Sequence, residues 1–371
     1  MKECKTNPIV NFIKKEVILC VASVLAIVSC FFVTPDKAYL NYIDFRTLMI
    51  LFTLMCVMEG FKQQGIFDKI AGFFLGRADN VRALCFIMVF LNFFSAMLIT
   101  NDVALITFVP FTILLLGLAD QKEWVLPIVI LETIGANLGS MLTPVGNPQN
   151  LYLYTTSGMN LLEFLKITAP ITAVSAGLLF IACLFIKREP VTKAGSQEIR
   201  PDKIRCLFFL IVFILSLGTV LEILPVWVPF VTVLTGTCLL QRKVLAKVDY
   251  CLLLTFISFF LFIGNMGRIP AIREWLISLV NGREMLVAFF SSQIISNVPA
   301  AILLSGFTTE YEELIKGVNI GGLGTLIASM ASLISYKYFA AEYPDKKGKY
   351  LLHFTIVNVV FAIVLILFTK L

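Results

Sequence analysis

Polar residues interrupt two long apolar runs of this chain, and these interruptions constrain its fold more than any other feature. Thr100-Asn101-Asp102 divides the run from Val81 to Leu118, and Ser296-Asn297 divides the run from Met285 to Phe307. In the hydrocarbon core of a bilayer, an exposed backbone N–H or C=O group costs several kcal/mol. Two such interruptions in corresponding halves of a chain therefore predict a polar chamber at membrane depth, as in transporters built from inverted repeats.

The composition agrees with a chain that lies largely in lipid. Hydrophobic residues make up 58% of the 371 residues and charged residues 15%, and the mean hydropathy is +0.90. Soluble domains carry about 25% charged residues. We therefore predict an all-α polytopic membrane protein with the lipid bilayer as a partner. The net charge of +6 is attributed to an excess of basic residues in the loops on one side of the membrane. Nucleic acid is therefore not expected as a partner.

The cysteines of this sequence are scattered and it has a single histidine, so neither residue type forms a cluster that could bind a metal ion or act in catalysis. Its nine cysteines form no C-x-x-C pair, and its single histidine, His353, begins the last apolar run. A zinc site needs several such ligands, so none is expected. Nucleophile-elbow, metalloprotease and phosphate-loop motifs are also missing from the sequence. We therefore expect no enzyme and no cofactor, with Na⁺ or H⁺ as a coupling ion.

The first half of the chain reads as a series of spans. A stretch of mixed polarity at 61–77 is expected to lie in the membrane interface. The apolar stretch 125–155 contains Pro144, Gly146 and Pro148, which cannot all lie in one intact helix. Asn147 is a good N-cap before Pro148, so we predict a helix, a break and a short second helix. Uninterrupted spans are expected at 17–33, 46–60 and 162–186.

The second half repeats this order after a polar connection. Basic residues exceed acidic ones in the linker 187–206, which indicates a cytoplasmic location. A helix at 207–225 follows the linker. Beyond it we expect spans at 226–240 and 249–264, an amphipathic piece at 268–276, the divided run at 284–307, a Gly-rich broken helix at 317–341 and a last span at 351–369.

The two halves, 1–186 and 226–371, are predicted to be inverted repeats with two re-entrant hairpins (81–118 and 284–307) and two broken transmembrane helices (125–155 and 317–341). Residues 137–142 are paired with residues 322–327. If each hairpin returns to the side of the membrane from which it entered, helix 207–225 inverts the second repeat. The N-terminus is then cytoplasmic and the C-terminus is outside. The loop charges agree with this topology except at Arg268 and Arg273. Hydropathy alone does not separate hairpins from pairs of full spans.

Three motifs resemble a known group of membrane proteins. They are G-S-M-L-T-P-V-G-N-P-Q-N at 139–150, T-N-D at 100–102 and S-N-V at 296–298. Together they resemble the ion-transporter superfamily, which includes divalent anion/sodium symporters, citrate-transporter-type permeases, arsenite permeases and D-type sodium/proton antiporters. The resemblance implies a homodimer and an elevator-like movement of a transport domain. Asp102 and Val298 depart from the Ser-Asn-Thr motif of the symporters, so the arsenite-permease and antiporter branch is the more similar one.

The resemblance also implies where the site lies, because it places both hairpin tips opposite the breaks near the midplane. Break residues 143–147 would face the inner tip, and residues 328–332 the outer tip. The substrate-binding residues implied are Thr100, Asn101, Thr143, Asn147, Ser296, Asn297, Ser329 and Ser332. The ion-coupling candidates are Asn101, Gly146 and Asn297 together with the acids Asp102 and Glu132, with a Na⁺ site possible near Asn101, Asp102, Thr143 and Gly146.

The chemistry of these residues also indicates ion binding, independently of the family resemblance. A helix beginning at Asn101 or Asn297 would direct free N–H groups and a positive dipole end into the chamber, which favours an anion. Asp102 at membrane depth is a functional hypothesis, as a Na⁺ ligand or a proton carrier, although an acid in a first helical turn also complements the helix dipole. Glu132 is expected about 12 Å deep, as a coupling proton site or a structural contact. Glu59 and Glu222 are read as interfacial.

The function predicted from these features is an ion-coupled (Na⁺ or H⁺) secondary active transporter of a small anion or oxyanion with elevator-type alternating access. The alternative is a Na⁺/H⁺ antiporter on the same scaffold, which Asp102 and Glu132 favour. A membrane-embedded enzyme is disfavoured because the sequence offers no nucleophile–base pair or metal cluster. A channel would not need a broken helix opposite each of two hairpins.

Overall fold

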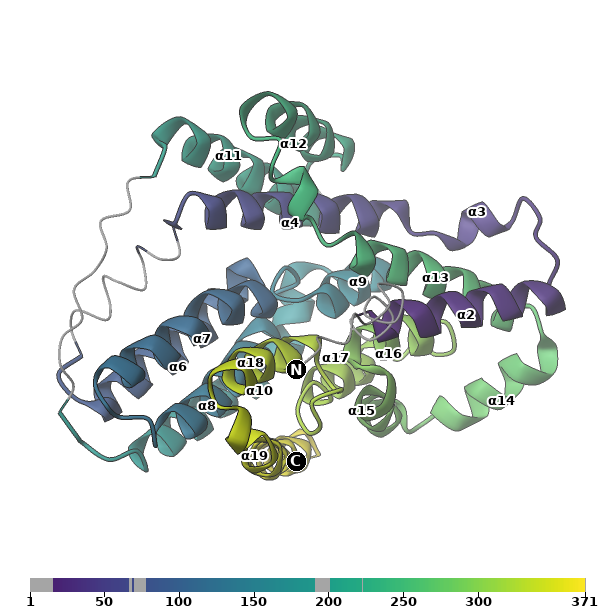
Figure 1. The fold of residues 1–371 in the computed structure, drawn as a ribbon. Helices are drawn as coiled ribbons and strands as arrows, with labels where there is room; N and C mark the ends of the chain where they lie inside the picture. The colour runs from purple at the N-terminus through teal and green to yellow at the C-terminus, as the bar shows by residue number, and fades with distance from the viewer. Residues whose placement is uncertain (1–15, 67–68, 70–77, 191–200, 222, 371) are drawn as a thin grey trace, which may run out of the picture.

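Helices make up almost all of the chain in the computed structural model, which describes residues 16–66, 69, 78–190, 201–221 and 223–370 (Figure 1). Within these residues there is no β-strand, and an isolated bridge joins Asn80 to Pro190. The all-α part of the predicted fold class is therefore confirmed for the described chain.

The helices follow the predicted order closely. In the first half they are α2 (Val17–Phe32), α3 (Tyr39–Tyr42), α4 (Phe45–Gln63), α6 (Val81–Ile99), α7 (Asn101–Leu118), α8 (Val125–Ser140), α9 (Pro148–Ser157) and α10 (Leu161–Leu184). In the second half they are α11 (Lys203–Val220), α12 (Trp227–Leu240), η1 (Leu245–Lys247), α13 (Tyr250–Gly267), α14 (Pro270–Val280), α15 (Glu284–Ile295), α16 (Asn297–Ser305), α17 (Tyr311–Ile320), α18 (Met330–Glu342), η2 (Pro344–Lys346) and α19 (Lys347–Thr369).

Among the described residues, five stretches are long and apolar enough to cross a membrane, as judged by length and composition. They are Val81–Ile99, Leu161–Leu184, Lys203–Val220, Tyr250–Gly267 and Pro344–Thr369. Shorter apolar helices accompany them, among them Leu19–Phe32 and Trp227–Leu240. Large apolar side chains such as Phe31, Phe185 and Leu239 are exposed, as expected for a surface that faces lipid.

Helices α6 and α7 form a helical hairpin whose tip is Thr100. Asn80 caps the start of α6, with its side chain accepting from the Ala83 N–H at 2.9 Å. The hairpin base is tied to the chain after α10, because the Val81 N–H donates to the Glu189 carbonyl at 2.8 Å. The arms have 19 and 18 residues, which at 1.5 Å per residue is about 28 Å each.

Helices α15 and α16 form the second hairpin, with Ser296 at its tip, and it is much shorter. Its arms have 12 and 9 residues, so they rise about 18 and 13 Å. A hydrocarbon core is about 30 Å thick, so these arms are too short to cross it singly. The side of the membrane on which each hairpin opens stays a prediction.

Both predicted broken helices are interrupted, but the second interruption lies earlier than expected. Helices α8 and α9 are separated by residues 141–147, and α17 and α18 by residues 321–329. The prediction that residues 328–332 are unwound is wrong for residues 330–332, which begin α18. The cause is a glycine cluster rather than proline, since Gly324 has a φ of +114°, which favours glycine over L residues.

The helices pack as two groups (Figure 1). In one group α4 packs against α11 and α12, and α2 packs along α13. The other group contains both hairpins, both broken helices, α10 and α19. The groups meet mainly where α13 contacts α16 and where α4 contacts α9. This division separates the helices that carry the predicted site from those that surround it.

Several predicted segments fall partly outside the described chain. Most of the interfacial stretch 61–77, residues 191–200 of the linker, and Glu222 lie outside the described residues. The amphipathic piece expected at 268–276 corresponds to α14, whose Trp275 is exposed.

Candidate functional site

The tip of the first hairpin is bonded to the first break. Thr100 joins α6 to α7 with a φ of +71°, a conformation that costs a β-branched residue free energy. This turn directs the Asn101 N–H to the Gly146 carbonyl at 3.2 Å. The Asn101 side chain accepts from the Asp102 N–H at 3.0 Å. The tip therefore sits against the break rather than in open space.

The tip of the second hairpin repeats this geometry. Ser296 has a φ of +75°, and the Asn297 N–H donates to the Ala328 carbonyl at 3.0 Å. The Asn297 side chain accepts from the Val298 N–H at 3.0 Å. Thr100 and Ser296 thus occupy equivalent positions, as do Gly146 and Ala328. The backbone N–H groups expected to be free at both tips are bonded instead, because each caps a carbonyl of the facing break.

An amide side chain satisfies the carbonyl groups of each break. Asn150 donates to the Met141 carbonyl at 3.0 Å and to the Thr143 carbonyl at 3.3 Å. In the second break, Gln293 donates to the carbonyls of Gly321 and Leu323, both at 2.9 Å. A buried unpaired carbonyl is costly, so these two amides are what allows the helices to be broken in an apolar setting.

Gly146 and Asn147 shape the end of the first break. A Cβ atom at Gly146 would collide with the Ser140 carbonyl, so this position requires glycine. Asn147 caps α9 by accepting from the Asn150 N–H at 2.9 Å. The Thr143 hydroxyl donates to the Met97 carbonyl near the hairpin tip. The predicted residues Thr143, Gly146 and Asn147 thus hold the tip and break together.

Two asparagines connect the broken helices reciprocally. Asn137 of α8 accepts from the Ser329 hydroxyl at 3.0 Å and donates to the Ser332 hydroxyl at 3.3 Å, both at the start of α18. Asn319 of α17 accepts from Asn147 at 3.3 Å and donates to Asn150 at 2.7 Å, at the start of α9. All six side chains are buried.

This reciprocal pattern corrects the sequence pairing of the two halves. Counting back from Gly146 and Ala328, Asn137 corresponds to Asn319 and not to Gly322. Asn137 also accepts from the Asn101 side chain at 3.1 Å, so it joins the first tip to the second broken helix. The structure therefore brings together Asn101, Asn147, Ser329 and Ser332 as predicted, through two asparagines that the sequence analysis did not single out.

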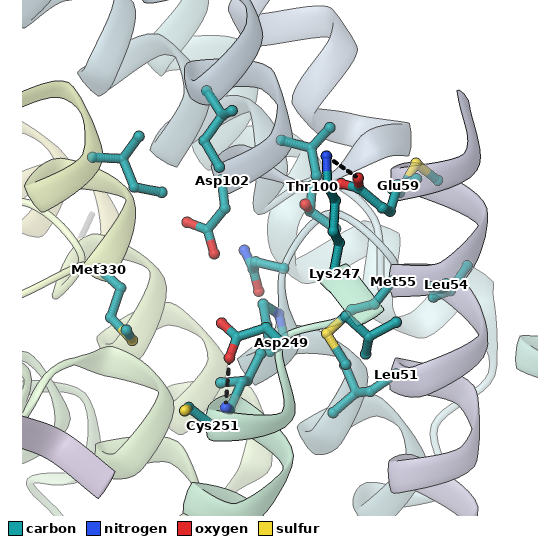
Figure 2. Close-up of a pocket in the computed structure, with 18 of the residues that line it drawn as sticks. Leu51, Leu54, Met55, Glu59, Thr100, Asp102, Lys247, Asp249, Cys251 and Met330 are labelled. Carbon is teal, nitrogen blue, oxygen red and sulfur yellow. Dashed lines mark hydrogen bonds and ion pairs between the residues drawn. The ribbon is translucent and has the colours of Figure 1, made fainter. Parts of the chain in front are cut away.

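A cavity of about 580 Å³ borders the first tip and the first break (Figure 2). Thr100, Asp102 and Asn147 line it, together with residues of α4, η1, α13 and α18. The carboxylates of Asp102 and Asp249 project into it from different helices (Figure 2). Lys247 pairs with Glu59 at 3.8 Å on the wall. Asn101, Ser296, Asn297, Ser329 and Ser332 are buried behind this cavity rather than on it.

The sequence analysis did not single out Asp249, and it left Glu132 open as a coupling proton site or a structural contact. Asp249 caps α13, with its side chain accepting from the Leu252 N–H at 2.9 Å, and no periodic signal marks it as a cavity residue. Glu59, expected at the interface, lines the cavity. Glu132 lies away from the cavity, fully buried, where it accepts from the Thr112 hydroxyl at 2.6 Å.

The comparisons with known proteins agree with this architecture. The citrate transporter family model matches residues 9–310. An uncharacterized transporter of Methanocaldococcus jannaschii is 33% identical over 343 residues, covering 91% of this chain and 92% of the relative. The inner membrane protein YbiR of Escherichia coli is 34% identical over 309 residues, covering 81% and 82%. A silicon efflux transporter of Oryza sativa is 28% identical over 173 residues, covering 46% of this chain and 35% of the relative.

The match over most of the chain confirms the resemblance stated from the motifs. Several relatives are named as transporters, which is consistent with the apolar helices of this chain. A small-molecule substrate within the bilayer follows from the family. The chain belongs to the citrate transporter family of membrane transporters.

Proposed function

We propose that this chain is an ion-coupled secondary active transporter of a small anion or oxyanion. The observation that carries the proposal is the buried polar centre in which each hairpin tip caps the break opposite it. Interrupted helices that meet at membrane depth are the arrangement by which transporters bind substrates and coupling ions. The cavity beside the first tip supplies a route of entry to this centre.

The polar groups at the centre suit an anion and a cation at neighbouring positions. Helices α7, α9, α16 and α18 all begin at the centre, and their positive dipole ends favour negative charge there. Thr100 offers a hydroxyl on the cavity wall, and Asn147 borders the cavity with its amide bonded to Ser140, Asn150 and Asn319. The carboxylate of Asp102, next to the tip, is suited to Na⁺ or H⁺. A Na⁺ site would add oxygens of Asn101, Thr143 and Gly146.

Alternating access would be an elevator-like movement of the hairpin-bearing helices against α2, α4 and α11–α13. The limited contact between these two groups supports such a movement. The short arms of α15 and α16 support a hairpin that returns to its own side. With that topology the N-terminus is cytoplasmic and the C-terminus is outside, and the exposed apolar faces would include a homodimer contact.

One observation favours a Na⁺/H⁺ antiporter instead. Four acids (Glu16, Glu59, Asp102 and Asp249) and three lysines (Lys62, Lys247 and Lys337) line the cavity. Lys247 is paired with Glu59, whereas the carboxylates of Asp102 and Asp249 project into the same space, which favours a cation between them (Figure 2). In this second function Asp102 and Asp249 would bind Na⁺ or H⁺ alternately, without an anionic substrate.

Flux into proteoliposomes separates the two functions. In the first, an inward Na⁺ or H⁺ gradient drives uptake of labelled citrate, succinate, phosphate or silicic acid. In the second, a Na⁺ pulse changes only the lumenal pH. Asp102→Asn should abolish the ion dependence in either case. Lys166→Gln, an exposed change on α10, is the matched control. If Asp102→Asn leaves transport and its ion dependence unchanged, the role given to Asp102 is wrong.

A further inference from the structure

Glu132 is a buried acid that lies outside the cavity at the first hairpin tip. It lies on α8, and its side chain is 0% exposed. Gly135 brings α6 close to α8, because a Cβ atom there would already lie 3.0 Å from the Val89 carbonyl. Helices α6 and α8 are therefore closely packed one turn from Glu132.

The hydrogen bonds of Glu132 are unequal at its two oxygens. Oε1 accepts from the Thr112 hydroxyl at 2.6 Å and from the Asn92 amide at 3.3 Å. The Asn92 amide is held in this orientation because its nitrogen also donates to the Met88 carbonyl at 2.9 Å. Among the described residues, Oε2 has no hydrogen-bond partner. An ionised carboxylate would leave charge on an oxygen that nothing stabilises.

No basic side chain of the described chain compensates that charge. The titratable groups beside it are Cys85 of α6, whose thiol donates a hydrogen bond to the Cys183 sulfur of α10, and Tyr350 of α19. Of the basic residues on helices packed against α8, Arg82 of α6 donates to the Ile186 carbonyl, and Lys316 of α17 is bonded to Glu312 and Glu313. The others are exposed, namely Lys166 of α10, Lys337 of α18, and Lys347, Lys349 and His353 of α19. This setting suits a neutral carboxylic acid.

The partners of Glu132 come from both arms of the first hairpin. Asn92 lies on α6 and Thr112 on α7, whereas Glu132 lies on the helix that leads into the first break. Other threonines of these helices donate to their own helix, as Thr107 does to Val103 and Thr133 does to Val129. Thr112 donates to Glu132 instead, so the carboxyl group joins three helices.

The positions of the second half that correspond to Asn92 and Glu132 carry apolar residues. Counting back from the tips Thr100 and Ser296, Asn92 corresponds to Ala288. Counting back from Gly146 and Ala328, Glu132 corresponds to Leu314. Since both counterparts are apolar, the Glu132 cluster is not a requirement of hairpin packing. It is an addition to the first hairpin alone.

We propose that Glu132 is a proton-binding site that clamps the first hairpin to α8 and couples H⁺ to transport. This inference rests on the proposed function and names H⁺ as its coupling ion. The proton binds Oε2, the oxygen without a donor, when the carboxyl group is enclosed. It is taken from water on one side and returned to water on the other. Loss of the proton leaves a buried charge, which the protein relieves by separating the hairpin arms from α8.

The link to the transport site is short. Glu132 precedes Asn137 by five residues on α8, which is about 7.5 Å along the helix axis. Asn137 contacts both the first tip and the start of α18. Movement of the hairpin against α8 therefore changes the bonds of the centre directly.

Infrared spectroscopy of the full chain in lipid tests the proton site without a substrate. At neutral pH the wild-type protein should show the C=O stretch of a buried protonated carboxylic acid. Glu132→Gln should remove that band, whereas Asp102→Asn and the buried control Glu284→Gln should retain it. Thr112→Val should shift it to higher frequency, because Oε1 loses a donor. A wild-type spectrum without the band, or a band that persists in Glu132→Gln, overturns the proposal.

Flux measurements test the coupling with a named probe. In proteoliposomes that take up labelled citrate, an inward H⁺ gradient should raise the rate of uptake by the wild-type protein several-fold. The same gradient should leave the rate of uptake by Glu132→Gln unchanged. A Glu132→Gln protein that still follows the gradient overturns the coupling role. If the wild-type protein moves no citrate in either condition, citrate is excluded as its substrate, and the infrared result alone decides the proton site.

Discussion

Replacing Asn137 by alanine should loosen the polar centre more than any other single substitution of an uncharged residue. The change removes an acceptor for the Asn101 amide and for the Ser329 hydroxyl, and a donor to the Ser332 hydroxyl. The serine hydroxyls can rotate toward carbonyls of their own helix. The Asn101 amide cannot rotate freely, because its oxygen is held by the Asp102 N–H.

The expected loss of stability in Asn137→Ala follows from the different fates of the Asn101 amide and the two serine hydroxyls. A buried donor left without a partner costs about 1–3 kcal/mol. Each of the two serine bonds contributes about 0.6 kcal/mol, the average for hydrogen bonds between helices in a membrane. Asn137→Ala should therefore lower the free energy of unfolding by about 2–4 kcal/mol. It should also abolish transport, because the first tip is no longer joined to α18.

Asn358→Ala is the matched control for this experiment. Asn358 is equally buried on α19, but its amide donates to Phe354 of its own helix, and its oxygen has no partner among the described residues. Its replacement should cost under about 1 kcal/mol. Reversible unfolding in mixed micelles, followed by circular dichroism, measures both variants. If Asn137→Ala falls within about 0.5 kcal/mol of Asn358→Ala, the bracing role of Asn137 is refuted.

Three further predictions concern the break, a loop contact and the topology. Gly146→Ala should lower flux at least tenfold and destabilise the protein by about 1–3 kcal/mol, since its Cβ would overlap the Ser140 carbonyl; Gly177→Ala, which meets no atom within 4 Å, is the control for thermal unfolding. The Arg268 guanidinium, 2.9 Å from the Asp36 carboxylate, lowers the pKa of that exposed side chain. This contact therefore stabilises the fold above the ordinary aspartate pKa of about 3.9, and the contribution is lost as the pH falls through the lowered pKa. Asp36→Asn should remove this acid-side decline from the Tm profile, and an unchanged profile would contradict it. Arg188→Cys and Glu312→Cys, each in a cysteine-free background, should label from opposite faces of the membrane, and labelling from one face would refute the inverted topology.

The local signals in the sequence located the tips and the first break, whereas the contacts between distant segments were not predictable. Thr100, Gly146 and Asn147 were found because polar residues, glycine and proline act on the chain within a few residues. Asn137 was missed because its hydroxyl partner Ser332 is 195 residues away, and a single amide in an apolar run looks like any buried polar group. Asn150 and Gln293 were missed for the same reason.

The second break shows how a local rule can misplace an element. Without proline, the break was expected beside Ser329, near the small residues that follow it. The structure unwinds the chain at Gly321 and resumes the helix at Met330, since glycine alone is sufficient to end α17 when Gln293 satisfies the carbonyls. That error also displaced the pairing of the halves by three residues, which hid the equivalence of Asn137 and Asn319.

The amides of Asn150 and Gln293 have a consequence for the transport cycle. Because these amides are side chains of the protein itself, the carbonyl groups of each break stay hydrogen-bonded whether or not a substrate or water is bound. A carrier of this kind does not have to refold its centre after each release. Both breaks can therefore keep their backbone bonds while the carrier returns without substrate, so the free-energy cost of the cycle lies in moving the hairpins.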